Sequence, residues 1–254
     1  MNRAPITWVG NIAAFAFTIV VNGLATSIPL GGQTPPEISA KYPSLFTPAG
    51  FTFSIWGVIY LGLTLFIIYQ ALPSQRHSSA LAKIDGLFKF SCFANTAWIL
   101  AWHYDYLLLS VGIMASILWS LVAIYRTLQA SKGVASIPER LLVHLPFSLY
   151  TAWISVAIIA NISAVQTGYG WDNIGMDAIS WTLLKLALAG AIGATVIARK
   201  ADMAFVLVIA WAAYGISVKQ ADTAAVSGAA TALMLLTLIL VLFELTRRFI
   251  AKIH

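Results

Sequence analysis

Residues 42–60 read YPSLFTPAGFTFSIWGVIY, a stretch that begins as a turn and ends as an apolar run. Pro43 and Pro48 cannot both lie inside one regular helix, because each lacks a backbone N–H and pushes the residue before it toward an extended conformation. The apolar run continues to about residue 68, which is long enough to cross a bilayer. Trp56 and Tyr60 are four residues apart and share one helix face. The stretch predicts a proline-rich loop that leads into a membrane helix with two aromatic side chains on one side.

The composition indicates a membrane protein. Of the 254 residues, 60% are hydrophobic and 9% are charged, and the mean hydropathy is +0.85. A soluble globular protein carries roughly 25% charged residues, so we predict an integral membrane protein. The single cysteine, Cys92, excludes an internal disulfide and a cysteine-based metal cage, and the four histidines form no ligand motif. We therefore expect no metal site and assign no cofactor firmly.

Apolar runs of roughly 17–25 residues, bounded by polar breaks, predict membrane-spanning helices. They cover residues 6–30, 49–69, 84–104, 106–125, 141–165, 178–198, 203–218 and 224–245. A membrane β-barrel would instead show segments of ~10 residues with alternating polarity. The first run could also be a signal peptide, although it is longer than the apolar part of such a peptide and no clear cleavage site follows it. We expect an all-α polytopic bundle of about eight transmembrane helices.

The basic residues indicate how these helices are oriented. With eight spans, both termini and the even-numbered connectors lie on one side, which collects almost all of the Lys and Arg residues outside the spans. The other side has only Lys41 and Lys219. By the positive-inside rule both termini are cytoplasmic, in what we expect to be a bacterial inner membrane. This asymmetry explains the formal charge of +6, and no basic stripe predicts a nucleic-acid partner.

Three sets of aromatic and polar residues could form a binding site in the first five spans. They are Trp56 with Tyr60 in the second span, Asn95 with Trp98 in the third, and Trp153, Ala157 and Asn161 in the fifth. Within each set, spacings of three or four residues place the side chains on one helix face. Such a surface would suit a large, flat, apolar ligand with a polar edge. The same residues could instead pack and hydrogen-bond between helices.

These motifs resemble those of the TspO/MBR family, the translocator or tryptophan-rich sensory proteins. The family pattern P-S-x(11)-W-x(3)-Y is matched by Pro43, Ser44, Trp56 and Tyr60. The pattern N-x-x-W is matched by Asn95 and Trp98, and W-x(3)-A-x(3)-N by Trp153, Ala157 and Asn161. The resemblance covers about residues 6–171 and implies five helices with a pocket under the first loop. It also implies binding of porphyrins and other hydrophobic ligands, with a role in tetrapyrrole handling, stress sensing or transport.

The chain departs from the family pattern in three places. The aromatic expected soon after the first loop proline is replaced, so Phe46 or Phe51 must substitute for it. Pro146 lies seven residues before Trp153, whereas the family proline lies four residues before its tryptophan. Three further predicted helices, within residues 178–245, have no counterpart in the five-helix family. We therefore expect a TspO-like core at residues 1–171 and a three-helix membrane extension at residues 172–254.

Two charged residues of the predicted extension stand out. Lys185 lies well inside the predicted span at residues 178–198, and charge at membrane depth is functional by default. Its side chain could alternatively reach toward the outer interface near Asp177. Glu244 is expected to pair with Arg247 or Arg248, which follow it by three and four residues.

Together with these residues, the resemblance implies a protein that binds a porphyrin-like tetrapyrrole, or another hydrophobic small molecule, within the lipid bilayer. The stacking walls would be Trp56, Tyr60, Trp98 and Trp153. Ala157 would leave space for the ligand, and Asn95 and Asn161 would orient its polar edge. The covering loop would contain Pro43, Ser44, Phe46, Pro48 and Phe51.

Two other functions stay open. A secondary transporter or permease for a small amphipathic molecule could use Lys185, although no pair of broken helices marks two equivalent halves. An enzyme that modifies a bound tetrapyrrole is the other alternative, yet no nucleophile with a base and no phosphate loop predicts a catalytic site. Small residues at 227–232, SGAATA, could support a homodimer.

Overall fold

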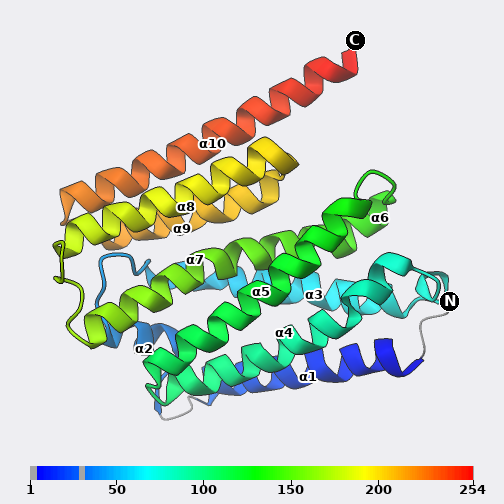
Figure 1. The fold of residues 1–254 in the computed structure, drawn as a ribbon, viewed down its shortest axis with the longest axis horizontal. Coiled ribbons are helices and arrows are strands. Elements are labelled where there is room, and N and C mark those ends of the chain that lie inside the picture. The colour runs from blue at the N-terminus through cyan, green and yellow to red at the C-terminus, as the bar shows by residue number, and fades with distance from the viewer. Residues whose placement is uncertain (1–4, 29–31, 254) are drawn as a thin grey trace. The chain divides into compact units, whose positions relative to one another are not determined.

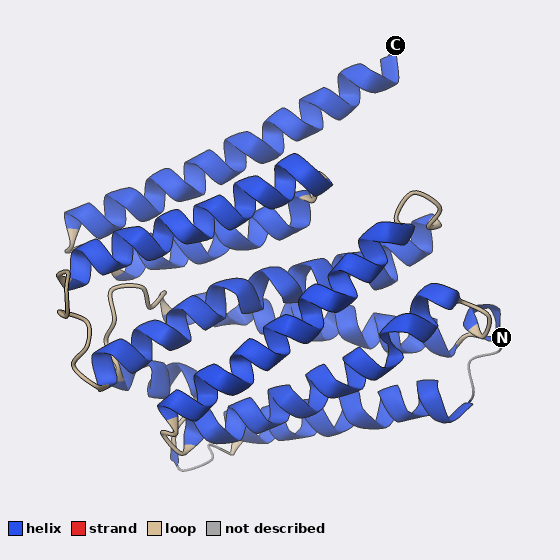
Figure 2. Cartoon of the chain, in the orientation of Figure 1, coloured by secondary structure: helices blue, strands red, loops and turns tan. Residues whose placement is uncertain are grey.

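The structure is a computed structural model that describes residues 5–28 and 32–253. Within these ranges the chain forms helices joined by loops, and no strand occurs (Figure 2). The helices of 17 residues or more are α1 (Pro5–Ser27), α3 (Ile55–Ala71), α4 (Ser79–His103), α5 (Leu107–Ser131), α7 (Leu145–Gly168), α8 (Ala178–Lys200), α9 (Met203–Lys219) and α10 (Ala224–Ile253) (Figure 1). The predicted all-α class is confirmed for this part of the chain.

Each predicted span coincides with one of these long helices. Among the described residues, six helices are long and apolar enough to cross a membrane, and α9 is a shorter apolar helix. Helix α4 is not among the six, because Lys83, Asp85 and Lys89 make its first half polar. The chain is therefore an integral membrane protein of the helical type, and the count of eight spans stays a prediction. The predicted end of the first span at residue 30 lies outside the described residues.

The chain folds into two compact units. Unit 1 comprises Met1–Ile38 and Ile55–Ile154, and unit 2 comprises Ser39–Ser54 and Ser155–His254. Helix α7 continues from unit 1 into unit 2 after residue 154. This division by packing differs from the predicted domains, residues 1–171 and 172–254, whose boundary followed the family resemblance. Residues 39–54 and 155–171, which the predicted domains group with the first helices, belong to unit 2.

The first connector is more ordered than the sequence predicts. It contains a short helix, α2 (Pro35–Lys41), and a 3₁₀ helix, η2 (Gly50–Ser54). Adjacent prolines suit the first turn of α2, where a backbone N–H has no partner inside the helix. Thr34 precedes this turn and donates its N–H to Glu37 Oε2 at 2.7 Å, half of a capping box. The second predicted span therefore begins as η2 and becomes α-helical at Ile55.

Aromatic side chains fill the centre of unit 1, where α4 packs between α1 and α5 (Figure 1). Phe66 on α3, Phe88 on α4 and Phe147 on α7 are all 0% exposed. Their ring centroids lie 5.0–5.8 Å apart, each pair in a T-shaped arrangement. The positive edge of one ring therefore meets the negative face of the next, which is a favoured geometry for buried aromatic pairs.

A π-helical turn at Arg140–His144 directly precedes α7, and Pro146 lies in the first turn of α7. The wider turn accommodates Pro146, which has no backbone N–H to donate and whose ring would crowd a carbonyl of a regular preceding turn. A Cβ added at Gly62 on α3 would lie 3.2 Å from the Pro146 ring, so glycine permits close approach of α3 and α7 at this level. The shifted proline thus has a packing partner inside unit 1.

In unit 2, α8, α9 and α10 lie side by side (Figure 1). A Cβ added at Gly193 would lie 2.9 Å from Ile209 Cδ1 on α9, so the absent side chain lets α8 and α9 approach closely. At the far end of α10, Glu244 pairs with Arg247 at 2.8 Å and with Arg248 at 2.7 Å. The predicted pairing of Glu244 is confirmed.

Candidate functional site

Three of the predicted aromatic residues meet in unit 1. Trp56 stacks on Tyr60 with ring centroids 5.3 Å apart and planes 24° apart, and both residues are half-buried. Trp153 meets the Trp56 ring edge-on at 6.3 Å, and Tyr150 does so at 5.8 Å. Trp153 and Tyr150 are each only 3% exposed. We call these four residues the aromatic cluster; it consists of a stacked pair from α3 and two perpendicular rings from α7.

The predicted polar residue Asn95 joins this cluster through Tyr150. Asn95 Nδ2 donates to the Tyr150 hydroxyl at 3.0 Å, and Asn95 Oδ1 accepts from Asn22 Nδ2 at 2.8 Å. The Asn95 amide thereby connects α4 to α1 and α7, a role that matches the interhelical alternative considered above.

Sequence reasoning missed Tyr150 and Asn22. Tyr150 precedes Trp153 by three residues, so the spacing rule that grouped Trp153 with Ala157 could have included it. Asn22 is an isolated amide in an apolar helix, which is a weaker signal, because nothing in the sequence names its partner.

The predicted wall residue Trp98 stacks on Trp102, with ring centroids 5.7 Å and planes 17° apart. Trp102 Nε1 donates to the Pro35 carbonyl of α2 at 3.4 Å. A second parallel aromatic pair therefore lies on α4, next to the start of the first connector.

Two further predicted site residues, Ala157 as the space for the ligand and Asn161 as a polar group, lie on the part of α7 that belongs to unit 2. Because α7 is helical through Gly168, Trp153, Ala157 and Asn161 follow one another along one helix face. Ala157 is half-buried, and Asn161 is 3% exposed.

The predicted covering loop is also part of unit 2, where it docks on α9. The Ala49 N–H donates to the Gly215 carbonyl at 2.9 Å, and Trp211 Nε1 donates to the Thr52 carbonyl at 2.9 Å. The ring of Phe51 packs against Trp211 at 5.4 Å and Tyr214 at 5.6 Å. Phe51 is thus held by two aromatic residues of α9.

The start of the same loop is stabilised by a hydrogen bond within the loop. The Ser44 and Thr47 hydroxyls lie 3.0 Å apart in a hydrogen bond, and Phe46 is 1% exposed. Pro48 is also buried. Of the two candidates for the missing family aromatic, Phe46 is therefore a core residue of unit 2, and Phe51 is the one that stays 42% exposed.

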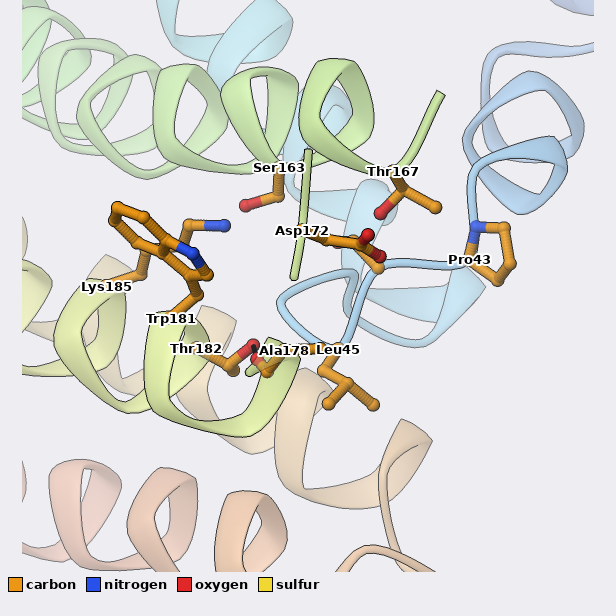
Figure 3. A pocket seen from close by; sticks show the side chains of 10 residues that line it. Pro43, Leu45, Ser163, Thr167, Asp172, Ala178, Trp181, Thr182 and Lys185 are labelled. Carbon is orange, nitrogen blue, oxygen red and sulfur yellow. Dashed lines mark hydrogen bonds between the residues drawn. The ribbon is translucent and has the colours of Figure 1, made fainter. Parts of the chain in front are cut away.

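Three residues that the sequence singled out separately surround one cavity of unit 2. Pro43 and Ser44 from the loop and Lys185 from α8 line a space of about 30 Å³ (Figure 3). Asp172, from the connector between α7 and α8, also lines it. Among the described residues, no group of three or more His, Cys, Asp or Glu side chains could hold a metal ion.

Comparison with known proteins identifies the family of the chain. The family model for TSPO-like protein matches residues 7–243. The match extends past residue 171, over α8, α9 and most of α10, which the sequence reading had placed outside the resemblance. No curated protein and no solved structure matches the chain significantly. Because the family model spans nearly the whole sequence, the chain belongs to the TSPO-like protein family.

Proposed function

We propose that this membrane protein binds a flat hydrophobic ligand of the porphyrin class at the aromatic cluster, in a sensory or transport role. The observation that carries the proposal is the stacked pair of Trp56 and Tyr60, which remains half-buried while Tyr150 and Trp153 stand edge-on beside it. A planar ligand could stack on the outer face of this parallel pair and extend the stack by one more layer.

The perpendicular rings would set the limits of this face. Tyr150 and Trp153 are almost fully buried, so they are rigid neighbours that define where a planar ligand ends. The half-buried Trp56 and Tyr60 rings are the ones that a ligand can reach. A ligand that stacks on Trp56 would therefore compete with the edge contacts inside the cluster.

The polar groups beside this face would be phenol hydroxyls rather than the Asn95 amide, since Tyr60 belongs to the stacked pair and Tyr150 stands edge-on to Trp56. Asn95 uses its donor on Tyr150 and its acceptor on Asn22. The Tyr150 oxygen accepts from Asn95, which leaves the phenolic proton for an acceptor on the ligand edge. Asn95 would then act as a positioning residue for Tyr150.

The test is a porphyrin titration of the purified full-length protein in detergent, followed by quenching of tryptophan fluorescence. Protoporphyrin IX should quench wild-type protein saturably. The double variant Trp56→Leu, Trp153→Leu should bind about tenfold more weakly or worse, because stacking on an aromatic ring contributes about 1–3 kcal/mol.

The matched control is Trp119→Leu, which removes a tryptophan that is 62% exposed on α5 and contacts Phe90. This variant should lose part of the fluorescence but keep the wild-type dissociation constant. An unchanged dissociation constant in the Trp56, Trp153 double variant would rule out the aromatic cluster as the binding site.

A further inference from the structure

The cavity of unit 2 combines charge, hydroxyl groups and apolar surface in one small space. Its polar lining comes from Ser44, Ser163, Thr167, Asp172, Thr182 and Lys185. In Figure 3 the Lys185 and Asp172 side chains are directed into the space between the end of α7 and the start of α8. Because all these residues belong to unit 2, the cavity shares no residue with the aromatic cluster of unit 1.

The positive charge of Lys185 and the negative charge of Asp172 balance each other, although the two side chains form no direct ion pair. Lys185 is half-buried and lies seven residues beyond the start of α8, or about 10 Å along the helix axis. Asp172 lines the same cavity as Lys185. Within the described part of the chain, however, no ion pair within 4.0 Å joins them. The cavity is therefore dipolar, with zero net charge.

The hydroxyl groups leave a defined set of donors and acceptors. Ser163 donates its proton to the Ile159 carbonyl at 2.8 Å, and Thr182 donates to the Ala178 carbonyl at 2.8 Å, so both hydroxyls offer acceptors. The Thr167 hydroxyl is shielded from solvent and has no hydrogen-bond partner among the described residues.

A buried hydroxyl without a partner is costly, and a bound polar group would satisfy it. Thr167 therefore indicates that the cavity takes a guest able to hydrogen-bond. The Lys185 ammonium group donates hydrogen bonds and the Asp172 carboxylate accepts them. The guest must therefore carry both acceptors and donors.

The net charge of the cavity further limits which molecules can bind in it. A purely anionic or purely cationic guest would leave one uncompensated charge in a poorly solvated place, which is unfavourable. A guest that carries one negative and one positive group can pair with Lys185 and Asp172 at once and keep the site neutral. The apolar part of such a guest could lie on the Trp181 ring, whose N–H is already donated to the Ile174 carbonyl at 3.2 Å.

We propose that this cavity binds the charged end of a small zwitterion, with an acidic group at Lys185 and a primary ammonium at Asp172. The volume of about 30 Å³ admits only the charged end, so the remainder of the molecule lies outside, toward Trp181 and Leu45. Free α-amino acids and ethanolamine phospholipids both present this pair of groups. This site goes beyond the proposed porphyrin binding and does not depend on it.

The first experiment uses purified full-length protein in lipid-free detergent and measures binding by isothermal titration calorimetry. The probes are leucine, 4-methylpentanoate, which lacks the amine, and 3-methylbutylamine, which lacks the carboxylate. Leucine should bind about tenfold more tightly than either analogue, because only leucine engages both charges. Equal affinity for leucine and 4-methylpentanoate would overturn the zwitterion assignment.

Substitutions then connect binding to the two side chains. Lys185→Met and Asp172→Asn should each weaken leucine binding about tenfold, and Asp172→Asn should raise the relative affinity for 4-methylpentanoate. The double variant keeps the cavity neutral and should remain folded, yet it should not distinguish leucine from its analogues. The matched controls are Lys219→Met and Asp222→Asn, which remove exposed charges away from the cavity lining and should leave leucine binding unchanged.

A second arm separates the two sources of the zwitterion. Protein in phosphatidylethanolamine nanodiscs is compared with protein in phosphatidylcholine nanodiscs, whose quaternary ammonium cannot donate a hydrogen bond to Asp172. Weaker leucine binding in phosphatidylethanolamine alone would identify the lipid as the occupant, and equal binding in both lipids would favour the free molecule. The absence of leucine binding in detergent, together with no lipid preference of the thermal unfolding temperature, would overturn the proposal.

Discussion

Buried amide side chains connect the helices of unit 1 at two levels. Asn11 on α1 donates from Nδ2 to Gln70 Oε1 at 2.9 Å and to Asp85 Oδ1 at 2.7 Å. Asn95 connects α1, α4 and α7 at the other level, through Asn22 and Tyr150. Lipid offers no competing hydrogen bonds, so such contacts select which helix faces meet.

Replacing Asn95 by Leu should destabilise the protein by about 1–3 kcal/mol, because the Asn22 amide and the Tyr150 hydroxyl lose their partner in a water-poor interior. Thermal unfolding in detergent measures this loss. Tyr150→Phe removes one hydroxyl and a single hydrogen bond, so it should cost less. If Asn95→Leu were as stable as wild type, the hydrogen bonds of Asn95 would make no contribution to the stability of the protein.

The proline-rich loop docks on α9, a helix far away from it in the sequence. Residues 44–54 lie on α9, and Gln220 at the end of that helix donates to the Ser44 and Thr47 carbonyls at 3.5 Å. The contact is close at Gly215, where an added Cβ would lie 2.0 Å from Thr52 Oγ1. Glycine at position 215 therefore permits the loop to pack closely against α9.

Gly215→Ala should release this loop from α9. We expect faster limited proteolysis within residues 44–54 and a lower unfolding temperature, because the added methyl group collides with Thr52. Gly228→Ala on α10 is the matched control, since a Cβ there meets nothing within 4 Å and alanine favours the helix. Equal proteolysis of the two variants would contradict the docked position of the loop.

Helix α8 begins with a charged cap that should make its first turn sensitive to acid. Asp177 Oδ1 accepts from the Ser180 N–H at 2.8 Å, and Oδ2 accepts from the Ser180 hydroxyl at 3.0 Å. These two hydrogen bonds, the backbone one first, hold the pKa of Asp177 below its ordinary value of 3.8. A lowered folded-state pKa means that the stabilisation is present above the unfolded pKa and is lost as the pH falls through the folded one.

Hydrogen exchange of the Ser180 amide, corrected for its intrinsic pH dependence, should therefore accelerate as the pH falls below 3.8. Asp177→Asn keeps a good capping residue without a titrating group, so its exchange should not respond over this range. A wild-type amide that stays equally protected down to pH 2 would contradict this assignment of the cap.

The long helices differ in how well they suit a membrane crossing. Six described helices meet the requirements of length and apolarity, whereas α4 is more polar and α9 is short. The tight turn between α4 and α5, where Asp105 adopts a φ of 56°, makes these two helices antiparallel neighbours. If α5 spans the bilayer, α4 can run beside it through the same thickness.

Cysteine labelling with a membrane-impermeant reagent tests this topology. In a Cys92→Ala background, cysteines at Gln75 and Lys132 should react from the cytoplasmic side, and one at Asp105 should react from the opposite side, as the distribution of basic residues predicts. Labelling of positions 75 and 105 from the same side would show that α4 does not cross. Whole cells and inverted vesicles provide the two directions of access.

Much of the helical framework could be predicted, because a bilayer requires long apolar segments whose ends are visible in the sequence. The grouping of Trp56 with Tyr60 followed from helical spacing alone. Tyr150 was missed because its significance depends on Asn95, which lies 55 positions away. The same holds for the Thr52 carbonyl and Trp211, which are 159 positions apart.

The sequence by itself determined the membrane class, the places of the long helices, the pairing of Glu244 and the family membership. These depend on hydropathy, local spacing and ordered motifs, all of which are properties of short segments. Only the tertiary structure decided that the proline-rich loop belongs with α9, that Asn95 serves Tyr150, and that Lys185 shares a cavity with Asp172 and Ser44. Such contacts join residues distant in the chain, and they form because polar groups in a lipid-embedded bundle need partners wherever the packing of helices can supply them.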